Sequence, residues 1–216
     1  MQSRIWVAGD FLLAFVPVIL ANVIARGMRA DALAGRPRRR VLWGSMLLAW
    51  LIFLPNTAYL LTEWRHYVNI ITEHPLYRHI YRGYGFTPGG TLFMALFTAF
   101  YFIYAGSGIV SMFLAIRPLD RLLTQAPARI RNLWRGVIFL LCSFGVFLGF
   151  VEKLNSWQIL SGRALYVIAR GAWHVMSQPA LAIVVIGFAG FLWAAYRALV
   201  LFENGLIHSR SERTIL

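Results

Sequence analysis

The stretch TLFMALFTAFYFIYAGSGIVSMFLAI, residues 91–116, decides the fold of this chain. It contains no charged side chain over its whole length. A helix needs about 20 mainly apolar residues to cross the hydrocarbon core of a bilayer, whereas a helix on the surface of a soluble domain carries a charged or polar face. The stretch therefore predicts a transmembrane helix.

Four other stretches have the same character, and each is bounded by charge, proline or glycine. The five predicted spans cover residues 5–25, 41–61, 91–116, 133–151 and 180–202. Only 13% of the 216 residues are charged, against about 25% in soluble domains. We predict an all-α fold: a polytopic transmembrane helix bundle that forms a single integral membrane domain over residues 1–216. The lipid bilayer is its first partner, and other membrane proteins are candidate further partners.

The net charge of +13 requires an explanation. In a soluble protein it would suggest binding to nucleic acid. Here the basic residues lie in short segments between apolar runs, and no basic stripe with base-stacking aromatic residues exists outside the spans. We therefore expect no nucleic-acid partner. Lys and Arg concentrate in the cytoplasmic segments of membrane proteins, and this explains the charge better.

The distribution of Lys and Arg also predicts the orientation. Segments 26–40 and 117–135 and the tail after residue 196 carry 14 of these residues, and the segments on the other side carry seven. This places the N-terminus outside and the C-terminus in the cytoplasm. The stretch 5–25 is longer than the apolar core of a usual cleavable signal. Because Arg26 and Arg29 follow it, we expect a retained first span.

Two segments on the predicted outer side are amphipathic. Segment 63–90 holds Tyr77, Tyr81 and Tyr84 at helical spacing, which suits the aromatic belt of a membrane protein. Segment 156–178 has a polar helical face that includes Arg170 and His174. We predict short interfacial helices on the outer face for both segments. A sixth span over 156–178 is the alternative.

The second span ends in a polar stripe. Asn56, Tyr59, Glu63 and His66 follow one another at spacings of three, four and three residues, so they share one face of a helix. Pro55 predicts a kink just before them. Polar side chains at membrane depth are costly unless they face protein or water. The stripe should therefore point into the bundle near its outer surface.

Further polar residues are expected at the same depth. They lie at the end of the fourth span and near the outer end of the first, and an acidic group there should pair with Arg65 or Lys153. We predict a polar, outward-facing pocket built from Asn56, Tyr59, Glu63, His66, Glu152, Asn155, Trp157 and Asp10. Two interpretations stay open: a functional pocket, or a structural network of hydrogen bonds between helices.

The pair Glu63 and His66 also has the spacing used by carboxylate-bridged metal bundles, and His74 and His79 could add ligands. Such bundles need two copies of the pair, and the sequence has one. We therefore assign no metal site, with Glu63 and His66 as the weaker candidates. No cofactor and no catalytic residue is identified, and whether the chain is an enzyme is left open.

Two motifs carry a resemblance to a known family. They are Pro55-Asn56-x-x-Tyr59-x-x-Thr62-Glu63-x-x-His66 and Asn155-Ser156-Trp157, with the small-residue run Gly106-Ser107-Gly108 to Ser111 between them. Together they resemble the bacterial membrane-protein family called domain of unknown function 1361, over residues from about 42 to 157. The resemblance implies a polytopic fold in the bacterial inner (plasma) membrane and no particular reaction.

The sequence departs from the family pattern at a few positions. The family has Asp where Glu63 stands, which keeps the carboxylate. It has Arg where Phe150 and Lys153 stand and Asp where Gln158 stands, so two charges of the second motif are lost. Three functions remain open: a membrane-embedded site or enzyme acting on a lipid-linked or envelope substrate, a non-catalytic accessory subunit, and a small transporter or channel.

Overall fold

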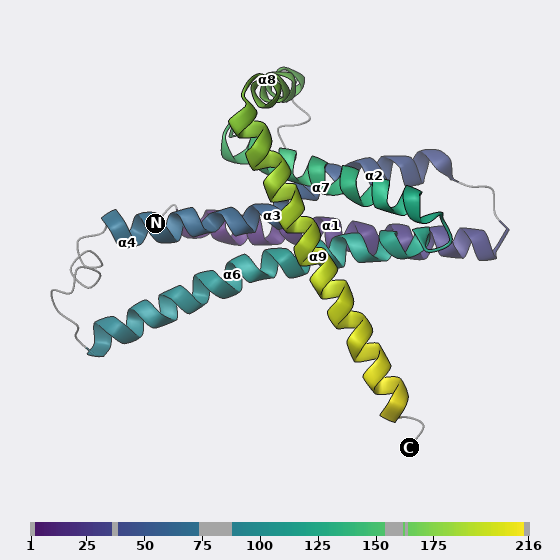
Figure 1. Cartoon of the computed structure of the whole chain (residues 1–216), viewed down its shortest axis with the longest axis horizontal. Coiled ribbons are helices and arrows are strands. Elements are labelled where there is room, and N and C mark those ends of the chain that lie inside the picture. The colour runs from purple at the N-terminus through teal and green to yellow at the C-terminus, as the bar shows by residue number, and fades with distance from the viewer. Residues whose placement is uncertain (1–2, 36–38, 74–87, 154–161, 163, 214–216) are drawn as a thin grey trace.

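The computed structural model of the chain describes residues 3–35, 39–73, 88–153, 162 and 164–213. Throughout these ranges the chain is helical, with short turns between helices and no strand (Figure 1). The elements in chain order are α1 (Ser3–Leu33), α2 (Arg40–Phe53), α3 (Pro55–Tyr59), the 3-10 helix η1 (Leu60–Glu63), α4 (Trp64–Glu73), α6 (Pro88–Asp120), the 3-10 helix η2 (Arg121–Leu123), α7 (Ala128–Phe150), α8 (Ala164–Ser177) and α9 (Pro179–Arg213).

Five stretches of this structure are long and apolar enough to cross a membrane. They are Phe11–Leu33, Arg40–Thr72, Gly90–Leu123, Ala128–Phe150 and Pro179–Ile207. The predicted all-α bundle of five spans is therefore confirmed. Helix α8, in the segment for which a sixth span was the alternative, has 14 residues. At 1.5 Å per residue it is about 21 Å long, which is short of the roughly 30 Å hydrocarbon core.

The helices extend further than the sequence predicted. Helix α1 continues past Arg26 and Arg29 to Leu33, and α6 continues past Arg117 to Asp120. Both helices therefore continue beyond the predicted spans into segments 26–40 and 117–135. The reason is that arginine is a good helix former, and its long side chain can reach water from a helix that has not yet left the membrane. Gly35, with a φ of 59°, then follows the end of α1.

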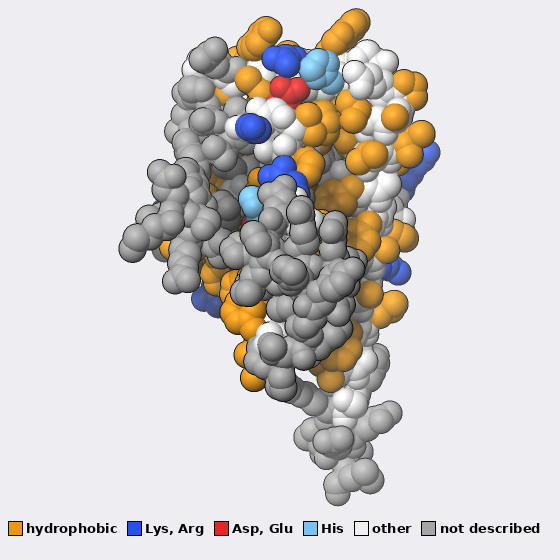
Figure 2. Space-filling model, turned by 90° about the vertical axis from the view of Figure 1, so that its left-hand side faces the viewer, with side chains coloured by type: hydrophobic (Ala, Val, Ile, Leu, Met, Phe, Trp, Pro, Cys, Tyr) orange, Lys and Arg blue, Asp and Glu red, His pale blue; other side chains and the backbone are white. Residues whose placement is uncertain are grey.

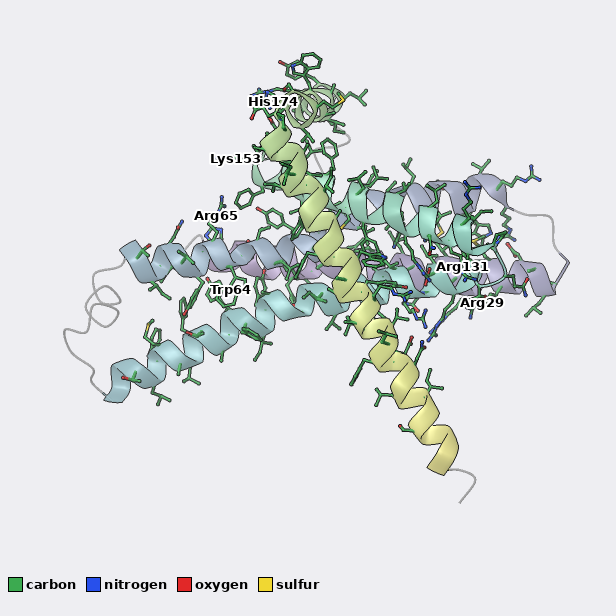
Figure 3. All side chains as sticks on the ribbon, viewed as in Figure 1. Arg29, Trp64, Arg65, Arg131, Lys153 and His174 are labelled. Carbon is green, nitrogen blue, oxygen red and sulfur yellow. The ribbon has the colours of Figure 1, made fainter. Side chains whose placement is uncertain are left out.

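The long helices run between two ends of the molecule (Figure 1). We call the end where α1 and α6 finish and α2 and α7 begin the arginine-rich end, and Figure 3 shows Arg29 and Arg131 there. We call the other end, where η1 and α4 lie beside the first half of α6, the Glu63 end. Helix α9 crosses α7 and α6 diagonally (Figure 1).

The core lies where α1, α2, α6, α7 and α9 meet. Buried Trp50 donates its indole N–H to the carbonyl oxygen of Ala115 at 3.0 Å and stacks on Trp134, with 6.1 Å between ring centroids. Cys142 is fully buried in the same core. Small residues allow the closest approaches, as small residues commonly do between helices in membranes. A Cβ on Gly145 would lie 2.3 Å from Cγ of Pro55, so α7 contacts the start of α3.

The outer surface of the bundle is apolar. Between 22% and 39% of each span is buried within the structure, and large hydrophobic side chains such as Leu12, Phe102, Ile103 and Ile183 are exposed. Figure 2 shows hydrophobic side chains over several parts of one face. In a protein surrounded by water such a surface would be a strong aggregation liability. Here it is the surface that contacts lipid.

Candidate functional site

The second span is interrupted where the polar stripe begins. Helix α2 ends at Phe53, α3 begins with Pro55, and residues Leu60–Glu63 form the 3-10 helix η1 before α4 continues. Proline lacks a backbone donor and cannot continue the hydrogen-bond ladder. After the proline, the backbone N–H and the hydroxyl of Thr57 both donate to the carbonyl of Leu54, at 3.1 and 2.8 Å. A 3-10 turn inside a span often marks a functional or strained position.

Glu63 is the buried member of the stripe. Glu63 is only 6% exposed. Its carboxylate oxygen Oε2 lies 3.9 Å from Nε2 of His66, and the side chain of His66 is 51% exposed. Asn56 and Tyr59 are half-buried. The stripe therefore begins in the interior of the bundle and reaches its surface at His66. A 3-10 helix has fewer residues per turn than an α-helix, so the residues after η1 point in a different direction from those before it.

The partner of this segment is α6. The hydroxyl of buried Tyr101 interacts electrostatically with the Glu63 carboxylate. Next to it, the Tyr67 hydroxyl lies 2.6 Å from Oγ1 of Thr98, and the Tyr67 ring contacts those of Trp64 and Phe97. These contacts make an aromatic wall between α4 and α6 beside Glu63. The sequence predicted an aromatic belt at Tyr77, Tyr81 and Tyr84, all of which lie outside the described residues.

Glu152 belongs to a separate cluster. Its Oε1 lies 3.0 Å from Nδ1 of His174, and its Oε2 lies 3.7 Å from Nε of Arg170, both on α8. At Glu152 the partners are therefore Arg170 and His174 rather than the candidates Arg65 and Lys153. Figure 2 shows acidic, basic and histidine side chains gathered near the top of the molecule, where α8 lies. The cluster holds amphipathic α8 against the end of α7.

Arg65 contacts an aromatic ring at the end of α7. Its guanidinium lies over the ring of Phe150, 4.6 Å from the centroid. Figure 3 shows Arg65 and Trp64 on opposite sides of the chain, with Trp64 toward α6. This places the Glu63 segment between α6 on one side and the end of α7 on the other. This is a cation–π contact rather than an ion pair.

Several predicted site residues lie outside the part of the chain that the structure describes. Asn155 and Trp157 lie outside the described residues, as do His74 and His79. Asp10 lies on α1, but its side chain is not among those described. Within the part of the chain that is described, no three His, Cys, Asp or Glu side chains gather as a metal site would require. Of the residues predicted to form the outer pocket, Asn56, Tyr59, Glu63 and His66 lie together in the described part of the second span.

Sequence reasoning missed a buried ion network at the arginine-rich end. The Asp120 carboxylate, 2% exposed, accepts two hydrogen bonds of 2.9 Å from Nε and Nη2 of Arg135. It also accepts a 2.9 Å bond from the hydroxyl of Tyr196, and Nη1 of Arg117 lies 3.5 Å away. The network joins α6, α7 and α9. The available signal was an isolated Asp inside an otherwise basic segment.

Glu203 on α9 extends the same network. Its carboxylate accepts a hydrogen bond of 2.6 Å from Nε of Arg117 and pairs with the guanidinium of Arg121. Bidentate arginine–carboxylate pairs are among the stronger protein hydrogen bonds, and removing one partner of a buried pair is strongly destabilising. The arginine-rich end is thus fixed by specific contacts as well as by its position relative to lipid.

Five apolar spans and charged networks at the two ends of the bundle define a multi-pass membrane protein. The sequence matches the family described as "Protein of unknown function (DUF1361)" over residues 10–194, and the chain belongs to this family. The resemblance seen in the motifs is confirmed, and it extends well beyond residues 42–157. Searches of curated proteins and of solved structures find no match.

Proposed function

We propose that this protein, in a bacterial inner membrane, binds a polar ligand of the membrane or envelope at an outward-facing site centred on Glu63. The main support for this proposal is that Glu63, which is only 6% exposed, lies where a 3-10 helix interrupts a membrane span. Ionisable residues inside spans are costly and usually mark a functional pathway or pocket. His66, at the surface and 3.9 Å from Glu63, connects the carboxylate with the exterior.

The chemistry of these groups fits a hydroxyl-rich or cationic ligand. A carboxylate accepts hydrogen bonds from hydroxyl or ammonium groups. Aromatic rings next to it, such as those of Trp64 and Tyr67, offer faces for sugar rings or cations. A lipid-linked envelope precursor presents such groups at the outer end of a span. If the site is catalytic, Glu63 and His66 are the candidate acid–base pair.

The outward orientation of the site is part of the proposal. It is supported by the excess of Lys and Arg in segments 26–40 and 117–135 and in the tail. Arg29 and Arg131, from two of these segments, lie at the same end of the bundle, away from Trp64 and Arg65 (Figure 3). Glu63 would then open toward the outer side.

The test is a comparison of the lipids that co-purify with wild-type protein and with Glu63→Gln, by mass spectrometry of extracted lipids. Glutamine keeps the size and removes the charge. We expect one lipid-linked species to fall at least about tenfold, because a hydrogen bond to a charged group contributes about 1.5 kcal/mol or more. Asp31→Asn is the matched control, since Asn can still accept the 3.0 Å bond from the Trp43 indole at the other end.

Equal lipid content in the two variants would contradict the proposal. Failure of Glu63→Gln to fold, with Asp31→Asn intact, would also contradict it, because the carboxylate would then have a structural role. Glu63→Asp shortens the side chain and keeps the charge that the proposal requires. We expect this variant to retain part of the bound species.

A second candidate function is that of an accessory subunit that packs against another membrane protein. The observation that favours it is a row of small, exposed residues on α9, namely Gly187, Gly190, Ala194 and Ala198, at the spacing of one helical face. A Cβ at Gly187 or Gly190 would meet nothing within 4 Å. Such surfaces let another helix approach closely. Replacing both glycines with Leu should release a co-purifying partner, whereas a wild-type preparation without any partner would contradict this function.

A further inference from the structure

A pocket at the arginine-rich end is lined mainly by positive charge. It has a volume of about 240 Å³ and lies between the end of α1 and the end of α6, with one residue from α9. Its polar lining consists of Asn22, Arg26, Arg29, Arg117, Arg121 and Glu203. Four arginines therefore share one concave surface with a single carboxylate.

The positive charges that line this pocket outnumber the negative charges. Glu203 pairs with Arg117 and Arg121, and it holds both guanidinium groups beside the pocket. Asp120, which also lies near Arg117, is held chiefly by Arg135. Among the described residues, no carboxylate pairs with Arg26 or Arg29. The pocket lining thus carries three more positive than negative charges, and like charges this close repel one another unless an anion lies between them.

The surroundings of the pocket indicate the form of that anion. Phe113 and Leu114 line the pocket as well, and Leu114 is 42% exposed on the membrane side of α6. The site therefore combines guanidinium donors with an apolar wall at the end of the spans. Planar guanidinium groups match phosphate oxygens, and basic pockets between membrane helices commonly hold lipid headgroups.

An alternative is that these arginines only anchor the helix ends in the lipid headgroup layer. Anchoring residues extend separately into water. Here the arginines of two helices instead converge on one pocket, and two of them are oriented by a carboxylate from a third helix. Convergence of like charges on one pocket favours an anion site over separate anchors.

We propose that the pocket formed by Arg26, Arg29, Arg117 and Arg121 binds a phosphate group. The phosphate can come from the headgroup of an anionic phospholipid or from a soluble phosphate compound. The site lies at the opposite end of the bundle from Glu63, and the inference does not depend on the function proposed there.

The test uses the full chain in detergent, with dioleoyl phosphatidylglycerol, dioleoyl phosphatidylcholine and inorganic phosphate as separate probes. Native mass spectrometry measures the bound lipid, and thermal unfolding measures the effect of phosphate. The pocket variant is Arg26→Gln with Arg29→Gln. Its matched control is Arg39→Gln with Arg40→Gln, two exposed arginines near the same end that do not line the pocket.

We expect wild-type protein to retain phosphatidylglycerol in preference to phosphatidylcholine. The pocket variant should bind the anionic lipid at least about tenfold more weakly, because it loses two charged donors, and the control should change by less than about twofold. A different outcome is that inorganic phosphate displaces the lipid, or binds alone in a way that requires Arg26 and Arg29. Either result would support the same site, with a soluble compound as the source of the phosphate group.

Two results would overturn the inference. One is equal weakening in the pocket variant and in the control, which would mean that net charge alone attracts the lipid. The other is the absence of any probe whose binding depends on Arg26 and Arg29. The variant Arg26→Lys with Arg29→Lys is the control for loss of binding through misfolding. It keeps both charges and should retain most of the binding.

Discussion

Glu63, Asp120, Glu152 and Glu203 each lie against a basic side chain. These carboxylates differ in how closely their basic partners approach. Asp120 receives two 2.9 Å bonds from one guanidinium, whereas Glu63 lies 3.9 Å from an imidazole that is half exposed. A well-satisfied buried pair favours a structural role, since all of its bonding capacity is used. The Glu63 carboxylate instead lies beside a side chain that reaches the surface of the bundle.

The first residue-scale prediction concerns Asp120. Replacing it with Asn removes the charge that Arg135 and Arg117 require, and Tyr196→Phe removes one hydroxyl from the same carboxylate. We expect Asp120→Asn to lower the free energy of unfolding by about 3 kcal/mol and Tyr196→Phe to lower it by about 1 kcal/mol. Unfolding in mixed detergent micelles measures both. A larger loss for Tyr196→Phe than for Asp120→Asn would contradict the assignment of Asp120 as the centre of the network.

The sequence located polar residues much better than it located their partners. The stripe Asn56, Tyr59, Glu63 and His66 follows from spacing alone, which depends only on helical periodicity. The pairing of Glu152 with Arg170 and His174 could not be predicted in this way, because it depends on how α8 folds back over α7. The Asp120–Arg135–Tyr196 network joins residues of three helices, and single-sequence periodicity contains no information about such contacts.

Among the helices, two close approaches arrange the second span, and a third joins α8 to α7. Gly108 of α6 and Gly145 of α7 lie against α3, and a Cβ on Gly108 would be 2.6 Å from the Thr57 carbonyl oxygen. The short helix α3 is thereby held between α6 and α7 while η1 contacts α6. Gly171 of α8 lies equally close to Leu148 of α7. The approaches at Gly108 and Gly145 fix the part of the second span that carries Glu63, and the approach at Gly171 lies beside the Glu152 side chain.

An element-scale prediction compares two glycines of α7. In Gly145→Ala the new Cβ would lie 2.3 Å from Cγ of Pro55, whereas in Gly136→Ala it would meet nothing within 4 Å. We expect Gly145→Ala to lower the free energy of unfolding by about 1–3 kcal/mol and Gly136→Ala to leave it unchanged or raise it by up to about 1 kcal/mol. Unfolding in mixed micelles compares them. Equal effects at both positions would mean that α7 and α3 do not approach as described.

A second element-scale prediction concerns the attachment of α8. Glu152→Gln weakens the contacts to His174 and Arg170, so amide hydrogens of α8 should exchange faster while those of α7 keep their protection. Hydrogen exchange read by mass spectrometry measures this. Lys153→Gln changes the adjacent charge and serves as the control. If exchange in α8 is the same in both variants, the Glu152 cluster is not what holds the helix.

At the scale of the whole molecule, the number of spans was predictable because it depends on length and hydropathy, which are local properties. The ends of the spans were harder to predict, because α1 and α6 include arginines that the charge pattern placed in the segments between spans. The diagonal path of α9 across α7 and α6 (Figure 1) has no sequence signature, because it follows from which side chains fit together. The orientation of the helices in the membrane decides which side Glu63 faces.

The proposed orientation puts the opening of the Glu63 site on the outer side of the membrane, and thiol labelling of intact cells is a direct test of this orientation. His66→Cys places a thiol at a half-exposed position beside Glu63, and Thr124→Cys places one in the turn between α6 and α7. Cys142 is fully buried and should stay unlabelled in both variants. We predict that a membrane-impermeant maleimide labels position 66 in intact cells and position 124 only after permeabilisation. Labelling of position 124 in intact cells, with position 66 protected until permeabilisation, would contradict this orientation.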